Sequence, residues 1–314
     1  MRREKRRFVR FLTAILTILP SAVLFTSCFT GIEGTKTVTL SKSDKSLIER
    51  DAEEKVMEKV VSEKLGKWLP GKKFLVTDSK IAYVLEGSPS SPLDFGTILT
   101  YKESEKKITP SGEENTSIVF DSGGNKLKYQ VRKPLGNALE TFLSSQLPML
   151  LDLDMVKEAG SVLVGNEYWI KTDLWYDEKD AYKKGRKFSK VKITSVAPGN
   201  ESFPLKVTFS DEDSQTAYIL MNFGNSGNES RSFSHLFSLK DIRNGYPNIS
   251  DEVWELIRQS KVAAGMTKEE CKLALGNPSD VNQGHDYSRT LEIWQYPDGS
   301  YLQFADGILV NFRK

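Results

Sequence analysis

Two cysteines, Cys28 and Cys271, carry the most distinctive side-chain chemistry in this sequence. Cys271 lies in the stretch "GMTKEECKLALGNP", where its thiol would act either as a nucleophile or as a small apolar side chain in a helix. Ala274 and Leu275 follow at helical spacing and share its face, and no nearby group is placed to lower the thiol pKa as catalysis requires. We therefore predict that Cys271 is a buried core residue, because free cysteine packs like a small hydrophobic side chain.

The other groups capable of catalysis do not form a recognisable set. The two histidines, His235 and His285, occur in polar contexts that predict loops, and the spacings H-E-x-x-H, C-x-x-C and G-x-S-x-G are missing from the sequence. Paired acids such as Asp152 and Asp154 are expected by chance among 42 acidic residues. We predict no catalytic residue, no metal and no cofactor. An enzyme would need His285, Asp286 and a second acid to converge in a deep pocket.

The N-terminal residues are typical of a secretory signal peptide. Residues 1–10 contain six Lys or Arg and one Glu, and residues 11–25 contain no charge. This uncharged run has 15 residues and includes Pro20, whereas a membrane-spanning helix needs about 20, so a permanent transmembrane anchor is the alternative. We assign residues 1–27 to a signal peptide and the polar residues 28–43 to a tether.

Cys28 follows two small residues in the stretch "LFTSC". This stretch resembles the lipobox of bacterial lipoprotein precursors, with Phe25 standing where leucine is usual. The resemblance implies that the Cys28 thiol receives a diacylglycerol and that cleavage frees its amine for a further acyl chain such as palmitate, which would hold the protein at a membrane. A chance cysteine after an ordinary cleavable signal is the alternative. Because Phe29 is not the acidic residue associated with inner-membrane retention, we expect the periplasmic face of the outer membrane.

The charge balance argues against nucleic acid as a partner. The chain carries a net charge of +2, of which residues 1–27 contribute +5, so residues 28–314 carry −3. No stripe of Lys and Arg remains to neutralise phosphates. With Cys28 lipidated, Cys271 is the one thiol left, and no intramolecular disulfide can form.

The body of the chain predicts an α+β fold of several units. Residues 44–69 have the apolar spacing of an amphipathic helix that ends near Gly66. Two stretches rich in short alternating strands and turns predict small β-barrel-like modules, SH3-like in type, that look like copies of one plan. The first module occupies residues 70–134 and the second occupies residues 161–223. A helical connector, residues 135–160, lies between them, and a linker, residues 224–248, follows the second.

The aromatic run "YWIKTDLWY" at residues 168–176 is a candidate surface for a partner. If it forms one strand, Trp169 and Trp175 point to the same side, opposite Tyr176. Exposed indoles would stack on a sugar or peptide, so we select Trp169, Trp175 and Tyr176 as a partner-binding surface. Core packing of these rings is favoured over exposure, because aromatic side chains mostly serve burial.

Residues 249–314 show the clearest local signals. Ser250 can cap a helix over residues 251–260, Thr267 and Glu270 form a capping box for a second helix, and Gly276 ends it. Three strands follow, with tight turns at residues 298–299 and 306–307, which gives the order ααβββ. Together with "GMTKEECKLALGNP" and "EIWQYPDGSYLQFADGILVNF", this order resembles the BamE/SmpA–OmlA-like domain of bacterial outer-membrane lipoproteins. The resemblance implies a two-layer domain without a cofactor that binds partners at the envelope.

These observations favour a non-enzymatic, lipid-anchored envelope lipoprotein that binds proteins or scaffolds an assembly, linked to outer-membrane organisation. The alternative is a lipoprotein that binds the glycan or peptide of the cell wall through the aromatic residues of its β modules. The sequence leaves open the identity of the partner, the membrane, the side of that membrane and the oligomeric state.

Overall fold

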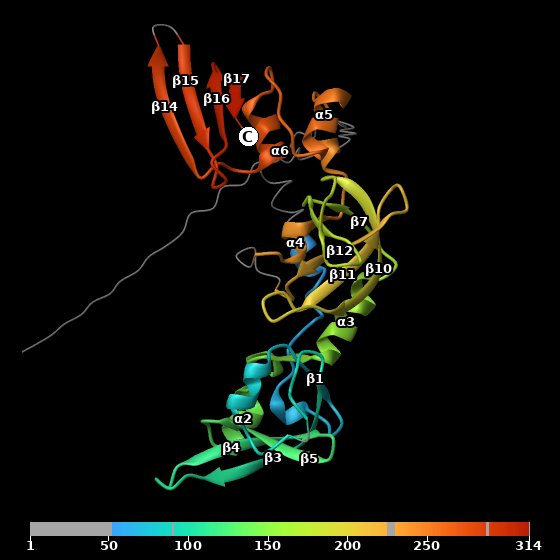
Figure 1. Cartoon of the computed structure of the whole chain (residues 1–314), viewed down its shortest axis with the longest axis vertical. Helices are drawn as coiled ribbons and strands as arrows, with labels where there is room; N and C mark the ends of the chain where they lie inside the picture. Colours follow the sequence, from blue (N-terminus) through green and yellow to red (C-terminus); the bar gives the residue numbers. More distant parts are fainter. Residues whose placement is uncertain (1–51, 90, 225–229, 287–288, 314) are drawn as a thin grey trace, which may run out of the picture. The chain divides into compact units, whose positions relative to one another are not determined.

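The computed structural model describes residues 52–89, 91–224, 230–286 and 289–313 (Figure 1). The signal peptide, Cys28 and the tether lie outside the described residues. The fold is mixed α/β and is built on antiparallel sheets, one of them curved into a half-barrel. The three sheets have the strand orders β2-β5-β4-β3-β1-β6, β13-β7-β10-β11-β12-β8-β9 and β14-β15-β16-β17.

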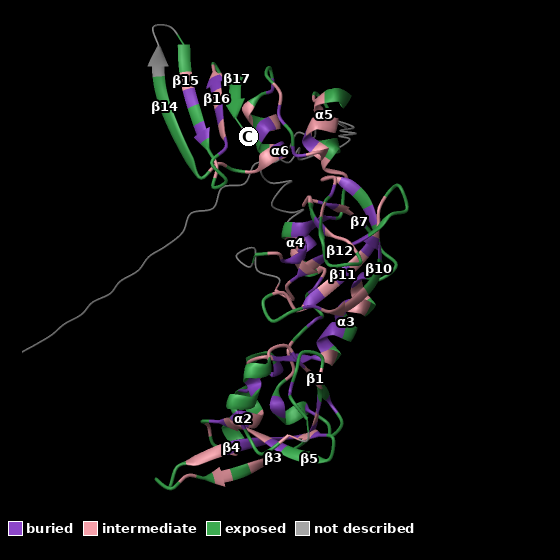
Figure 2. Cartoon of the chain, viewed as in Figure 1, coloured by how far each residue is buried: buried purple, intermediate pink, exposed green. Residues whose placement is uncertain are grey.

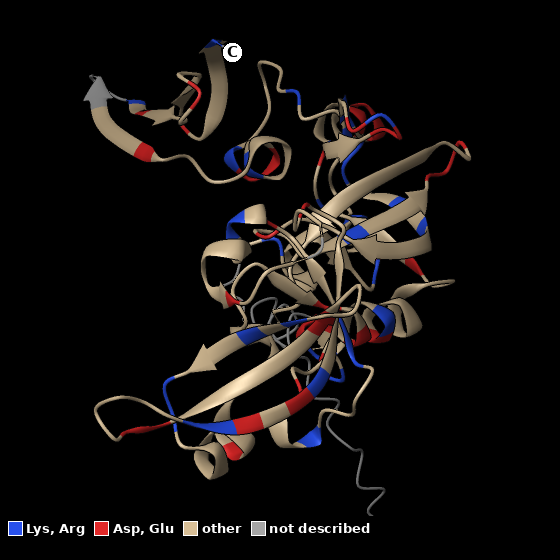
Figure 3. Ribbon diagram, turned by 60° about the horizontal axis from the view of Figure 1, so that its bottom comes forward, with Lys and Arg blue, Asp and Glu red and all other residues tan. Residues whose placement is uncertain are grey.

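The first sheet occupies residues 73–152. Its strands are β1 (Lys73–Val76), β2 (Leu85–Glu86), β3 (Ile98–Ile108), β4 (Glu114–Ser122), β5 (Asn125–Val131) and β6 (Leu150–Asp152). Helical turns surround the strands: η1 (Leu65–Lys67), η2 (Ser79–Tyr83), α2 (Leu135–Thr141) and η3 (Ser144–Gln146). The exposed side of β3 mixes Lys and Glu (Figure 3), which pair with neighbours such as Glu86 and Lys128. These ion pairs link β3 to strands that are not its direct neighbours in the sheet, and exposed pairs of this kind each contribute about 0–1 kcal/mol.

The second sheet begins after α3 (Leu153–Leu163). Its strands are β7 (Glu167–Ile170), β8 (Leu174–Tyr176), β9 (Tyr182–Lys184), β10 (Ser189–Pro198), β11 (Leu205–Ser210), β12 (Thr216–Met221) and β13 (Phe237–Ser238), with α4 (Phe233–Leu236) before the last strand. Alternate residues of β11, Leu205, Val207 and Phe209, are fully buried (Figure 2), as the period of two predicts. Met155, Ala159 and Leu163 of α3 complete this core.

The two sheets follow the same path through space. A first strand, β1 or β7, pairs with a long strand, β3 or β10, from which a meander leads to β5 or β12. A short strand between them, β2 or β8, leaves to pair with the end of that meander. A last strand, β6 or β13, returns to pair with the first. The long strands even share a register shift, which follows Tyr101 in β3 and Ile193 in β10.

Three boundaries predicted from the sequence are wrong in detail. The helix predicted over residues 44–69 is α-helical, within its described part, only over residues 52–55, and one turn of 3-10 helix, η1, follows later. It breaks because its apolar residues serve two cores: Met57 and Val60 pack with the second sheet, and Leu65 and Trp68 with the first. Strands β6 and β13 lie in the predicted connector and linker, because strands of two or three residues are too short to show a period.

The C-terminal part contains η4 (Ile242–Gly245), α5 (Asp251–Arg258), α6 (Lys268–Leu275), β14 (Asp280–Asp286), β15 (Arg289–Gln295), β16 (Tyr301–Ala305) and β17 (Ile308–Arg313). Its helix caps are confirmed: Ser250 accepts from the Val253 amide, and Thr267 and Glu270 form the capping box. The number of strands is wrong, because β14 adds a fourth. Residues 280–284 are exposed (Figure 2), so this edge strand lacks the apolar alternation that marks a strand in a sequence.

The prediction for Cys271 is confirmed. Its side chain is fully buried in α6, against a core that includes Trp294 and Phe304. Burial raises the pKa of the Cys271 thiol to about 12, with a further contribution from Glu270. The residue is therefore a packing group, since a reactive cysteine needs an accessible thiolate.

Candidate functional site

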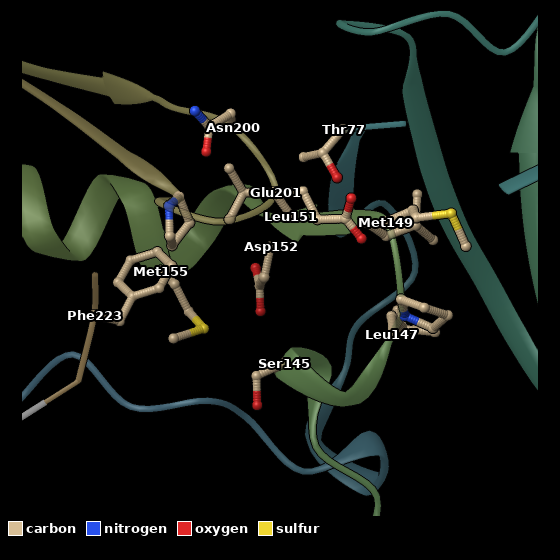
Figure 4. A pocket seen from close by; sticks show the side chains of 13 residues that line it. Thr77, Ser145, Leu147, Met149, Leu151, Asp152, Met155, Asn200, Glu201 and Phe223 are labelled. Atoms are coloured by element: carbon tan, nitrogen blue, oxygen red, sulfur yellow. The ribbon is translucent and has the colours of Figure 1, made fainter. Parts of the chain in front are cut away.

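A pocket of about 260 Å³ lies where the first sheet ends and α3 begins (Figure 4). One wall comes from the segment that precedes β6 and from β6 itself. Thr77, directly after β1, the β10–β11 loop with Asn200 and Glu201, and Phe223 after β12 contribute the rest. Its walls combine hydroxyl, amide and carboxylate groups with the apolar surface of residues such as Leu147, Met149 and Met155.

Asp152 is the most constrained polar residue of this pocket. It is the last residue of β6, where it pairs with Phe74, and it is also the N-cap of α3, where its side chain accepts a hydrogen bond from the Asp154 amide at 3.0 Å. Its side chain is only 1% exposed. Oδ2 is buried without a hydrogen-bond partner among the described residues. A buried carboxylate oxygen in that condition has a strong preference for a donor.

Lys72 approaches the same carboxylate from outside the pocket lining. Its ammonium nitrogen lies 3.0 Å from Oδ1 of Asp152, 2.7 Å from Oδ2 of Asp154 and 3.3 Å from Oε2 of Glu63. Burial lowers the pKa of Lys72, but hydrogen bonds and charge from Asp154 and Asp152 outweigh it and leave this pKa above its ordinary value. One ammonium group thus serves three carboxylates at once.

Met149 gives the pocket wall its shape. This residue has a backbone φ of +58°, in the left-handed region that non-glycine residues rarely occupy. Its carbonyl accepts a hydrogen bond from the Thr77 amide at 2.9 Å, which holds the turn against β1. Such a conformation costs about 1–3 kcal/mol and persists where the surrounding structure enforces it.

The polar groups of this pocket are carboxylates, hydroxyls and an amide. Asp152 and Glu201 supply carboxylates, and Thr77 and Ser145 supply hydroxyls. Neither histidine nor cysteine is among the described lining residues, so the pocket holds no group whose ordinary pKa lies near neutrality. The carboxylates and hydroxyls of the pocket can accept hydrogen bonds from a donor that lies next to an apolar wall.

The predicted aromatic surface is only partly a surface. Trp175 is 2% exposed, its ring lies edge-on to Phe209 at 5.0 Å, and its Nε1 donates to the Thr172 carbonyl at 2.8 Å. Trp175 is therefore wrongly placed in the candidate partner-binding surface, and core packing, the favoured interpretation, is right for this residue. The expected single strand is broken between β7 and β8, and this break resets the alternation of faces so that Trp175 points inward. Trp169 remains half-buried, with the Lys190 ammonium 5.6 Å from its ring centroid.

Tyr176 belongs to a group that the sequence did not reveal. Its ring stacks on Tyr218 at 5.3 Å, and the Lys206 ammonium lies 3.9 Å from the Tyr218 ring centroid. The Tyr218 hydroxyl donates to Asp180, which also accepts from Lys206. Burial, together with Asp180, raises the pKa of Tyr218 to about 12. Tyr176, Lys206 and Tyr218 come from three different strands, so no local spacing pointed to this group.

Neither histidine is among the described residues that line this pocket. His235 lies in α4, where its Nδ1 is 2.7 Å from the Ser232 hydroxyl, and the backbone of His285 lies in β14. Both were expected in loops, and both are in regular structure. Within the described ranges, no group of three or more Cys, His, Asp or Glu is placed to hold a metal ion.

Asp152 itself was missed because it looked like one acid among many. The signal was present in "MLLDLDMV", where two acids interrupt an apolar run, since a carboxylate in such a run is forced into a buried setting. Glu201 offered no signal, because the turn "PGNES" reads as an ordinary solvated loop.

Among the described helices, none has the length and apolar content needed to cross a bilayer. Searches with protein-family models, against curated proteins and against solved structures found no match to this chain.

Proposed function

We propose that this chain is a lipid-anchored bacterial envelope protein that binds protein partners and does no catalysis. The observation that carries the proposal is the order of signals at residues 1–28: a basic start, an uncharged run and two small residues before Cys28. Acyl chains on Cys28 would hold the chain at a membrane through the burial of their methylene groups. The outer membrane, on its periplasmic side, is the expected location.

Two SH3-like modules made by duplication would supply the binding surfaces. The shared strand path, the matching register shifts in β3 and β10, and the return of β6 and β13 to the first strand of each sheet support this assignment. Helical turns, η3 and α4, precede the returning strand in both. Two unrelated sheets would have little reason to share all of these features.

The C-terminal part would act as a BamE-like partner-binding domain. Its support is the capped helix α6 after Gly265-Met266-Thr267, followed by the hairpins with turns at Asp298-Gly299 and Asp306-Gly307. The additional strand β14 departs from the ααβββ order of the resembled family. Because β14 is an exposed edge strand, it would be an addition to the domain and not a replacement of one of its elements.

The anchor is tested by the Cys28→Ala variant in bacterial cells. Lipidation predicts that this variant loses acyl labelling and remains unprocessed, whereas the wild-type chain is labelled with palmitate and found in the outer-membrane fraction after cell fractionation. Cys271→Ala is the matched control and should keep both labelling and processing, because its thiol is buried in α6. Equal labelling of wild type and Cys28→Ala would contradict the anchor. Crosslinking in living cells would then identify the partners.

A cell-wall ligand is the second candidate, and the observation in its favour is the carboxylate-lined pocket beside Asp152. Cell-wall binding predicts that the full chain in detergent is retained on insoluble peptidoglycan. Trp169→Ala should weaken this retention if the aromatic surface contributes, and Trp175 is unsuited to the test because it is buried. Passage of the chain through the polymer without retention would eliminate this candidate and leave the protein-binding proposal standing.

A further inference from the structure

We propose that the pocket beside Asp152 binds the primary ammonium group of a lysine-type side chain, with its unbranched apolar stem along the pocket wall. This inference concerns the pocket alone and does not depend on the lipid anchor or on the envelope role.

The free oxygen of Asp152 defines the polar end of the site. Figure 4 shows this carboxylate directed into the pocket, between Ser145 and Met155. Oδ1 is engaged with Lys72 and with the Asp154 amide, whereas Oδ2 is buried and has no partner among the described residues. An ammonium group has three donors, so it could reach Oδ2 and still bond to a hydroxyl such as that of Ser145.

The charge of the surroundings favours a cation over a neutral donor. The charged side chains that line the pocket, Asp152 and Glu201, are both carboxylates. The Lys72 ammonium, which lies outside this lining, is already shared among three carboxylates. A hydrogen bond between ionised groups is roughly twice as strong as one between neutral groups. A protonated amine would therefore be preferred over a hydroxyl of the same size.

The same geometry disfavours the two other common cations. Calcium takes about six to eight oxygen ligands, whereas the pocket lining has carboxylates only at Asp152 and Glu201, and one oxygen of Asp152 is already engaged. A guanidinium group is bound best by both oxygens of one carboxylate, and Asp152 has only Oδ2 without a partner among the described residues. A compact ammonium needs one free oxygen, which is what the pocket provides.

The size and lining of the pocket fit a single side chain. Pockets for drug-sized ligands measure about 300–1,000 Å³, and this one, at about 260 Å³, lies below that range. Leu147, Met149, Met155 and Phe223 offer apolar surface for a stem of methylene groups. Methionine adapts to such a stem because its side chain is unbranched and flexible.

The proposal is tested by calorimetric titration of the full chain in detergent with N-acetyl-lysine methylamide, at concentrations up to millimolar. N-acetyl-norleucine methylamide, which has a similar stem and no ammonium, is the matched probe. We expect the lysine probe to bind at least about tenfold more tightly than the norleucine probe, because only the former satisfies Oδ2. Equal affinity for the two probes, or no binding of the lysine probe, would overturn the proposal.

Variants separate the pocket from the ion-pair network around it. Asp152→Asn should weaken the lysine probe by about tenfold or more, whereas Asp154→Asn, which also loses a contact to Lys72 but does not line the pocket, should leave the affinity within about twofold. An equal loss of affinity in Asp154→Asn and Asp152→Asn would contradict the site.

A second variant is needed in case Asp152→Asn does not fold, as judged by near-UV circular dichroism. Glu201→Gln then tests the proposal, because Glu201 is exposed in a loop. This variant is expected to weaken the probe several-fold, and an unchanged affinity would count against the proposal. Calcium binding that excludes the lysine probe would also overturn it.

Discussion

Replacing Trp175 with alanine is expected to lower the free energy of unfolding by about 3–5 kcal/mol, the range found for large aromatic residues removed from protein cores. The indole is fully enclosed, in contact with Phe209, and makes a hydrogen bond to the Thr172 carbonyl. Gly185 packs so closely that a Cβ placed there would lie 2.1 Å from the indole ring. A backbone this close to the ring leaves a cavity that cannot easily collapse, so we expect a value in the upper part of the range.

Trp169→Ala is the matched control, because it removes the same side chain from a half-buried position six residues away. Its expected cost is about 1 kcal/mol, since the ring is only half-buried, with the Lys190 ammonium 5.6 Å from its centroid. Urea unfolding followed by far-UV circular dichroism measures both variants without relying on tryptophan fluorescence. Equal destabilisation of the two variants would mean that Trp175 does not occupy the core of the second sheet.

Replacing Lys72 with methionine is expected to cost about 3–5 kcal/mol, because it leaves the Asp152 carboxylate buried without its cation. Both side chains of this ion pair are nearly inaccessible, at 4% and 1% exposed, so solvent does little to screen the loss. Adding Asp152→Asn to Lys72→Met should recover much of the stability, since the second change removes the unpaired charge. Lys67→Met, at an exposed position of η1, is the control and should change stability by less than about 0.5 kcal/mol. Failure of the double variant to recover would mean that Lys72 acts through packing alone.

The same ion pair gives a pH dependence at alkaline pH. The pKa of Lys72 is higher in the folded protein than its ordinary value of 10.5. The stability that Lys72 contributes is therefore fully present below pH 10.5 and is lost as the pH rises through the folded pKa. Lys72→Met should lack this alkaline component in unfolding curves recorded on either side of that pH.

Local chemistry made the C-terminal helices predictable. Ser250, Thr267, Glu270 and Gly276 each act within one helical turn, so their roles depend on near neighbours that the sequence places directly. The burial of Cys271 followed from the same spacing. Turns at Asp298-Gly299 and Asp306-Gly307 were predictable for a similar reason, because a tight turn is specified by the residues in it.

Features that depend on distant partners could not be predicted in this way. The helix expected over residues 44–69 breaks because Met57 and Leu65 pack into different hydrophobic cores. The local sequence does not show which core an apolar residue will join. Trp175 turns inward because a short break after β7 reverses the alternation. Asp152 could not be singled out because the buried ion pair that it forms is with Lys72, which lies 80 positions earlier in the chain. The likeness of the two β modules was visible in the sequence, whereas their closing strands were too short to recognise.

The double role of Asp152 has a consequence for how the protein transmits force. This residue ends the strand that closes the first sheet, and the next residue begins α3, whose apolar face is part of the core of the second sheet. No slack segment therefore separates the two modules along the chain. Tension applied along the chain would pass from the first module to the second through a hydrogen-bonded strand and a capped helix.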